Sequence, residues 1–332
     1  MERDTLSRAD HDEVRIGVSA CLLGSKVRYD GGHKKNDFLT NTLSRFVTWV
    51  PICPEVEIGL GIPRPTLRLV EADGEVRLVE APQGRAGQAG GADHTHTMRE
   101  WAQRKMRWIA GMNLSGYVLK KDSPSCGMER VRLYGKNMTP RRSGRGLFAD
   151  ALISAYPSLP VEEEGRLTDP HLRENFIERV FAYHELRRLF DNRWNIGQLV
   201  AFHSRHKLQL LAHSNAACQR LGRLVANARH LGQAELARRY EAQFMDALRV
   251  VTTPQRNVNV LQHIAGYFKD RLDPAERAEL QGVIADFRAG LVPLIVPITL
   301  IRHYVTKFNI TYLQDQVYLA PHPKELMLRN HV

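Results

Sequence analysis

Residues 14–24 have the sequence VRIGVSACLLG. Their first part, VRIGVSA (residues 14–20), is a short apolar run that leads directly into Cys21, and Gly24 follows three residues later. An apolar run of this length, bounded by turn signals, is typical of a strand buried inside a sheet. Residues 115–119, SGYVL, repeat the arrangement and lead into KKDSPSCG around Cys126. Residues 37–50, and a longer segment that begins at His94, have the apolar spacing of helices. Strands that alternate with helices and end in loops predict an α/β domain.

The second half of the chain has a different pattern. From Arg173 onward, apolar residues recur every three or four positions in successive segments, which predicts an all-helical bundle of about seven helices. Residues 158–172 mix proline, acidic and turn-forming residues and are predicted to be a linker. We therefore expect an α/β domain over residues 1–157 and a helical domain over residues 173–332.

The composition is that of an ordinary globular protein. Of the 332 residues, 43% are hydrophobic and 25% are charged. No apolar run approaches the roughly 18 residues that cross a bilayer, and the charged segment MERDTLSRADHDEVRIG lacks the apolar core of a secretion signal. We expect a cytoplasmic protein with no membrane partner, whose four widely spaced cysteines are not paired in disulfides.

The positive charge gathers in two stretches. The formal net charge is +11; residues 101–150 carry 11 Lys and Arg against 3 Asp and Glu, and residues 201–250 carry 8 against 3. Such stretches favour a polyanionic partner, with nucleic acid first, although a solvated basic surface would look the same. Residues 135–146, GKNMTPRRSGRG, predict a mobile basic loop that could follow a nucleic-acid backbone.

Three cysteines, Cys21, Cys53 and Cys126, each lie where a predicted strand runs into a turn. Thiolates are soft ligands that suit iron–sulfur clusters, zinc or copper(I), but the paired spacing of closed zinc sites is missing here. Three readings remain: a cluster on three cysteines with one iron open, zinc with a histidine as fourth ligand, or cysteines without a ligand. Cys218, in a predicted helix, is interpreted as a small core residue.

Three motifs carry a resemblance to a known family. They are SACLLGSKVRYDGG (residues 19–32), CPEVEIGLGIPRP (residues 53–65) and KKDSPSCG (residues 120–127). Together, over residues 14–155, they resemble the thiouracil desulfidase (TudS-like) family. The helical half resembles the YbgA-type domain, and the fusion of the two resembles the RudS-type tRNA 4-thiouridine desulfidases.

The resemblance implies an enzyme with a [4Fe–4S] cluster on Cys21, Cys53 and Cys126. It implies that the enzyme converts 4-thiouridine in tRNA to uridine and hydrosulfide, with the open iron accepting the sulfur. Two alternatives stay open. The chain could act on free thiouracil or thiouridine nucleosides, or it could be a non-catalytic iron–sulfur protein that binds RNA or senses redox state.

The reaction requires further residues near the cysteines. Attack of water on a thiocarbonyl needs an acid/base group, and Glu55 lies two residues after Cys53. The resemblance suggests Ser123 for proton relay or substrate orientation. Polar residues of the same motifs are candidates for binding the uracil edge, the ribose or a phosphate, although each could instead serve a structural salt bridge or remain a solvated charge. These candidates are Arg28, Tyr29, Asp30, Arg64, Ser125 and Lys121.

Overall fold

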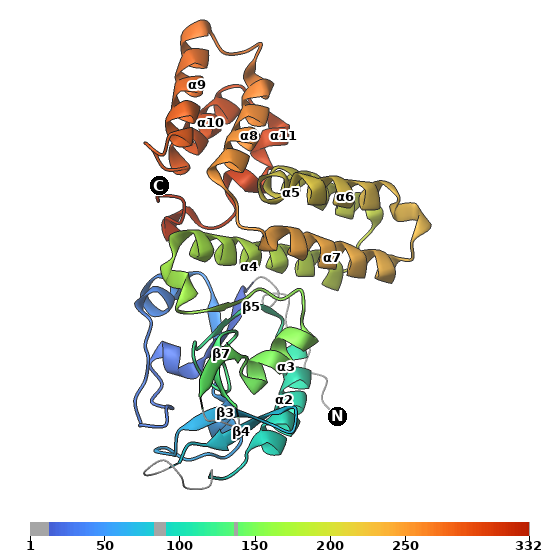
Figure 1. Ribbon diagram of the computed structural model, residues 1–332. Helices are drawn as coiled ribbons and strands as arrows, with labels where there is room; N and C mark the ends of the chain where they lie inside the picture. Colours follow the sequence, from blue (N-terminus) through green and yellow to red (C-terminus); the bar gives the residue numbers. More distant parts are fainter. Residues whose placement is uncertain (1–12, 83–90, 136–138, 332) are drawn as a thin grey trace. The chain divides into compact units, whose positions relative to one another are not determined.

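The computed structural model describes residues 13–82, 91–135 and 139–331. The chain divides into two compact units, Met1–Thr168 and Asp169–Val332. The first unit is built of strands and helices and the second is entirely helical (Figure 1), so the predicted fold class is confirmed.

The first sheet of the N-terminal unit is fully parallel. Its strand order is β2-β1-β5-β8, and β1 pairs in parallel with both β2 and β5. Every residue of β5 is buried, as expected for a strand covered on both faces. The strands are β1 (Arg15–Ser19), β2 (Thr48–Ile52), β5 (Leu114–Leu119) and β8 (Val161–Glu163).

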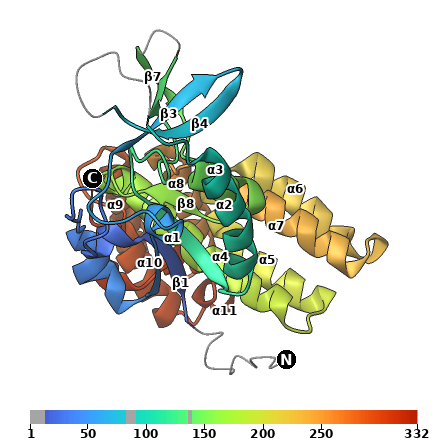
Figure 2. The same cartoon turned by 90° about the horizontal axis from the view of Figure 1, so that it is seen from below.

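The second sheet of this unit is mixed, with strand order β4-β3-β6-β7. In both views β3 and β4 lie away from the first sheet (Figures 1 and 2). Residues 135–146 were expected to form a mobile loop; of these, 140–144 form β7 instead, and 136–138 lie outside the described residues. The strands are β3 (Leu67–Ala72), β4 (Glu75–Glu80), β6 (Val131–Tyr134) and β7 (Pro140–Gly144).

Helices cover the first sheet, and α2 packs side by side with α3 (Figure 2). Phe148 of α3 joins the layers, since its ring lies 5.5 Å from Trp101 of α2 and 5.7 Å from Tyr117 of β5. The helical elements are α1 (Pro54–Glu57), α2 (Thr95–Ala110) and α3 (Leu147–Ala155), with one-turn elements η2 (Ala20–Leu23), η3 (Phe38–Thr42), η4 (Leu43–Arg45) and η5 (Arg166–Thr168).

Two segments differ from the sequence-based expectation. Residues 37–50 were predicted as one helix, but helical turns cover only residues 38–45, and strand β2 begins at Thr48. Trp49 and Val50 favour a strand, and Pro51 is tolerated because β2 is an edge strand. The segment predicted as a linker, residues 158–172, contains β8, η5 and the first turn of the next helix.

The C-terminal unit is a set of helices with clear start signals. Asp169, Asn195 and Asp273 cap three helices by accepting hydrogen bonds from backbone amides of the first turn. None of the helices in the described part of the chain is long and apolar enough to cross a membrane. The helices are α4 (Pro170–Asp191), α5 (Ile196–His213), α6 (Asn215–Ala226), α7 (Gln233–Arg249), α8 (Pro254–Ala265), α9 (Pro274–Arg288), α10 (Ile295–Lys307) and α11 (Thr311–Gln314). The one-turn elements are η6 (Ala228–His230), η7 (Gly266–Phe268), η8 (Val317–Leu319) and η9 (Lys324–Leu326).

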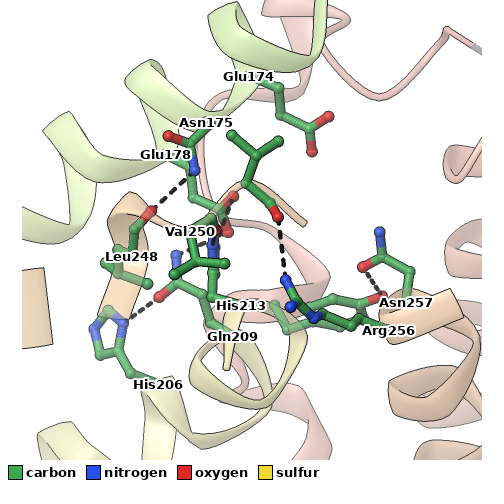
Figure 3. A network of polar contacts seen from close by, with 12 residues as sticks. Glu174, Asn175, Glu178, His206, Gln209, His213, Leu248, Val250, Arg256 and Asn257 are labelled. Carbon is green, nitrogen blue, oxygen red and sulfur yellow. Dashed lines mark hydrogen bonds and ion pairs between the residues drawn. The ribbon is translucent and has the colours of Figure 1, made fainter. Parts of the chain in front are cut away.

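A buried polar network ties α4 to α5 in this unit (Figure 3). The Glu178 carboxylate accepts a hydrogen bond from Gln209 Nε2 at 2.9 Å and lies 3.4 Å from His213 Nε2. Burial alone would raise the pKa of Glu178, but His213, followed by Arg329, holds it at about 2. The carboxylate is therefore charged and paired inside the helical core, which is how a buried charge is tolerated.

The N-terminus of α3 packs directly on the loop that carries Cys126. The backbone amide of Gly146 donates to the Gly127 carbonyl at 2.8 Å, and the amide of Phe148 donates to the Ser125 carbonyl at 3.0 Å. The first amides of a helix have no partner within the helix, so the loop satisfies them. A Cβ at Gly146 would lie 2.5 Å from the Ser125 carbonyl carbon and oxygen, so only glycine fits this approach.

We expect Gly146→Ala to lower the free energy of unfolding of the N-terminal unit by about 2 kcal/mol, because the added methyl group overpacks against backbone. Denaturant titration followed by tryptophan fluorescence, to which Trp101 packed against Phe148 contributes, measures this. Gly135→Ala is the matched control, because a Cβ there meets nothing within 4 Å. Equal unfolding midpoints for the two variants would show that the close approach at Gly146 is unimportant.

Candidate active site

The parallel sheet gathers the three cysteines at one edge. Cys21 lies in η2 directly after β1, Cys53 caps α1 directly after β2, and Cys126 lies in the loop that follows β5. All three line the same cavity, whose volume is about 360 Å³. Cys21 and Cys126 are buried and Cys53 is half-buried, and none of them forms a disulfide.

The electrostatics of the cavity disfavour three bare thiolates. Burial, followed by the nearby Cys53, raises the pKa of Cys21 to about 11. Burial raises the pKa of Cys126 well above its usual value, and the pKa of Cys53 is raised by burial as well. A bound metal centre removes the cost of burying a thiolate, because a thiol that coordinates a metal ion is deprotonated outright. The three thiols therefore fit a cationic iron centre better than an empty, charged cavity.

The donor set does not match a single metal ion. Within the described residues, no group of three or more His, Cys, Asp or Glu side chains is arranged to hold one ion. No histidine is among the described residues that line the cavity, so the zinc alternative lacks its fourth ligand. In an iron–sulfur cluster the thiolates bind different irons, so the sulfur atoms need not converge on one point.

Glu55 lines the cavity and is held from two sides. Its Oε1 accepts a hydrogen bond from Ser125 Oγ at 3.0 Å. Its Oε2 accepts from Arg64 Nε at 3.2 Å and also pairs closely with Arg64 Nη2. Arg64 also donates to the carbonyls of Val27 and Gly61, and its side chain is only 4% exposed. Although Arg64 lines the cavity, its guanidinium is thus engaged in orienting the Glu55 carboxylate.

The two serines of the third motif have different positions. Ser123 lines the cavity, and its Oγ accepts hydrogen bonds from the amides of Ser125 at 3.2 Å and Cys126 at 3.0 Å. Ser125 is fully buried and does not line the cavity. It lies behind Glu55, to which its hydroxyl donates a hydrogen bond. Ser125 is therefore placed to support Glu55, and Ser123 to shape the backbone around Cys126.

Three of the other predicted substrate-binding residues, Arg28, Tyr29 and Lys121, line the cavity, whereas Asp30 does not. Asp30 lies 3.4 Å from Arg28 Nη1, and its pKa is lowered, first by a hydrogen bond from the Gly32 amide. Arg28 also lies 5.2 Å from the centre of the Tyr29 ring, which is 40% exposed. The RYD stretch thus places a cation and an aromatic ring at the cavity, with Asp30 as partner of the cation.

The polar lining residues that sequence reasoning did not single out include Ser19, Lys34, Thr66 and Asp122. Ser19 hydrogen-bonds the Cys126 thiol, which partly offsets the rise in its pKa. The position of Ser19, at the end of a strand and two residues before Cys21, was a usable signal. The sequence around Lys34 gave no such signal. Lys34 reaches the site because its backbone amide donates a hydrogen bond to the Cys21 carbonyl, at 2.9 Å.

Each of two family models matches within one of the two compact units of the chain. The family model for 2-thiouracil desulfurase matches residues 16–164, and the model for a protein of unknown function, DUF1722, matches residues 207–323. The solved structure of the [4Fe-4S]-dependent thiouracil desulfidase TudS matches with 29% identity and a TM-score of 0.37, over 47% of this chain and 95% of that chain.

Two curated relatives match over most of their own length. The uncharacterized protein YbgA of Escherichia coli strain K12 is 34% identical over 158 residues, which are 47% of this chain and 94% of that protein. The uncharacterized protein YbbK of Bacillus subtilis strain 168 is 31% identical over 112 residues, which are 34% of this chain and 72% of that protein. The chain therefore belongs to the 2-thiouracil desulfurase family of enzymes through its N-terminal domain, which is followed by a YbgA-like DUF1722 domain.

Proposed function

We propose that this protein is an iron–sulfur-dependent desulfidase that converts 4-thiouridine in tRNA to uridine and hydrosulfide. The observation that carries the proposal is the shared cavity, in which three thiols from three strand ends face a carboxylate held by an arginine and a serine. Its volume of about 360 Å³ is within the usual range for sites that enclose a small molecule.

Cys21, Cys53 and Cys126 would hold a [4Fe–4S] cluster. When bound on three thiolates, such a cluster supplies a thiophilic Lewis acid for the sulfur of the substrate. The chain provides a buried wall behind this position, because two of the three thiols, Cys21 and Cys126, are buried. Exclusion of water strengthens the electrostatic interactions between the site and the reacting thiocarbonyl.

Glu55 is the acid/base group of the proposal. A water molecule forms the new C–O bond, the C–S bond breaks, and hydrosulfide leaves; the oxidation state of the carbon does not change, so no oxidant or reductant is consumed. Glu55 accepts one proton of the attacking water and passes it to the departing sulfur, which leaves as hydrosulfide, and the second water proton is released as the new carbonyl forms. Each carboxylate oxygen has two lone pairs, so the hydrogen bonds from Arg64 and Ser125 fix its orientation and leave room for water.

Recognition of the thiolated base falls to the cavity rim. The partly exposed Tyr29 ring offers a stacking surface for a base that has left its helix. Arg28 and Lys121 line the same cavity and supply positive charge for a ribose or phosphate oxygen. A tRNA also needs positive surface away from the site, which the basic stretches at residues 101–150 and 201–250 provide.

Iron content tests the ligand assignment. We expect anaerobically purified protein to contain about four iron and four sulfide ions per chain. Cys53→Ser should lose most of both, because removal of a thiolate leaves the cluster with two ligands. Cys218→Ser, which alters a thiol in the other unit, should keep them. Wild-type protein without iron, or a Cys53→Ser variant with full iron content, would refute the cluster.

Glu55→Gln tests the acid/base assignment. The amide keeps the shape of the side chain but cannot take a proton, so we expect turnover to fall about 100-fold or more with iron content unchanged. Glu57→Gln is the matched control, because that exposed carboxylate pairs with Lys105 at 2.9 Å and does not line the cavity. An unchanged rate for Glu55→Gln at normal iron content would remove Glu55 from the mechanism.

Salt dependence distinguishes tRNA from a free base as the substrate. Loss of thiocarbonyl absorbance should be measured on 4-thiouridine in tRNA and on free thiouracil, between about 50 and 200 mM salt. We expect kcat/KM for tRNA to fall at least about 10-fold over this range, because phosphate contacts release counterions, while the free base shows little change. Activity on the free base alone, or equal salt sensitivity for both substrates, would favour a free-base desulfidase instead.

A further inference from the structure

The helical unit contains a second, larger cavity that the desulfidase reaction does not use. Its volume is about 710 Å³, and residues of α5, α6, α8, η7 and α11 line it. We propose that this cavity binds a nucleoside phosphate unit, that is, a planar base together with its phosphate. Its polar and aromatic lining includes Lys207, Asn215, Gln219, Asn259, Tyr267 and Tyr312.

Two tyrosines form an aromatic platform in this cavity. The rings of Tyr267 and Tyr312 are stacked, with centroids 5.4 Å apart and an angle of 19° between their planes. Tyr267 remains 46% exposed although it lines the cavity. A third planar ring can stack on the accessible face of such a pair. Any of the nucleobases can do so, because each has a flat aromatic face.

The charge of the cavity favours an anion. No carboxylate is among the described residues that line it, and the sequence from residue 192 to 234, which includes α5 and α6, contains no Asp or Glu. Lys207 has no carboxylate within ion-pair distance in the described part of the chain, so its charge is available to a ligand. A lysine in a site without acidic neighbours is a phosphate-binding arrangement.

The other polar groups of the cavity suit the edge of a base. Asn215, Gln219 and Asn259 carry amides, each of which can both donate and accept hydrogen bonds. Gln219 Nε2 donates to Asn215 Oδ1 at 3.4 Å, so the amide nitrogen of Asn215 and the amide oxygen of Gln219 are the groups offered to a ligand. Amides of this kind match the mixed donor and acceptor pattern of a base edge. A purely anionic ligand, such as inorganic phosphate, would need neither these amides nor the aromatic platform.

His203 adds a fixed, uncharged group. Its Nδ1 shares a hydrogen bond of 3.1 Å with the hydroxyl of the fully buried Tyr240, which sets the orientation of the ring. Its Nε2 lies beside Gly222, another lining residue, at 3.8 Å from where a Cβ would stand. Burial, followed by Lys207, lowers the pKa of His203 to about 4. The imidazole is therefore neutral at pH 7. His203 thus adds no second positive charge beside that of Lys207, one turn further along α5.

The test is a binding assay with the full chain and two probes, a fluorescently labelled single-stranded hexauridylate and free uridine monophosphate. Tyr267→Ala should weaken binding at least about 10-fold, since stacking is lost, whereas Tyr267→Phe should stay within about two-fold of wild type. Lys207→Met should weaken binding and reduce the slope of log K against log salt by about one. Lys324→Met, a change on η9 outside the cavity, is the matched control.

The two probes distinguish the source of the nucleotide. If both probes bind and Tyr267→Ala and Lys207→Met weaken both, the cavity accepts a free nucleotide as well as a strand. If only the oligonucleotide binds and the same variants weaken it, the ligand is RNA. Either result supports the proposal. The proposal is overturned if neither probe binds, if Tyr267→Ala and Lys207→Met bind as wild type does, or if an equally charged acidic peptide competes as well as the nucleotide. The RNA outcome rests on the proposed function, since it would add a nucleotide contact within residues 201–250. The assay contains no thiolated substrate, so a failure of nucleotide binding is distinguishable from a failure of the desulfidase proposal.

Discussion

Parallel pairing of β1 with β2 and β5 is the constraint on which the active site depends. Parallel strands bring their carboxyl ends to one edge of a sheet, and ligands of open α/β sheets bind beyond that edge. Here each of the three strands is followed directly by a loop or turn that carries one cysteine. Side chains that are distant in the sequence therefore meet, because the buried sheet fixes the spacing of the loops that carry them, and hydrogen bonds between the loops, such as that from Ser125 to Glu55, add to this.

The supports behind the cavity are as specific as the residues that line it. Arg64 and Ser125 orient the Glu55 carboxylate, each through a different carboxylate oxygen. The N-terminus of α3 holds the Cys126 loop through amides that have no partner within the helix. A catalytic group gains most from such support, because its rotamer is set before the substrate arrives. Two residues considered as substrate contacts, Arg64 and Ser125, thus act in the structure as partners of the candidate acid/base group.

The helical unit has a different physical character. Its core contains charged side chains, but these are paired with one another, as Glu174 and Glu178 are with Arg329. Among the described residues, Lys207 of α5 and Arg220 and Arg223 of α6 form no ion pair, whereas Arg205 of α5 pairs with Glu185. These two helices contain no carboxylates of their own, and they line the cavity that holds the stacked tyrosines. Both units therefore combine an aromatic ring with a nearby cation at a cavity, which is the combination that nucleotides and bases require.

The sequence by itself determined the fold class, the change of class along the chain and the identity of the cysteine motifs, because strand and helix periodicity and local turn residues are encoded in neighbouring positions. It did not determine that Lys34 and Thr66 reach the cavity, that Arg64 pairs with Glu55, that residues 140–144 extend the second sheet, or that Tyr267 stacks on Tyr312. Those facts depend on which segments the folded chain brings together. Tertiary packing decides them, since the local sequence of each of these residues is compatible with several partners and the folded chain selects one.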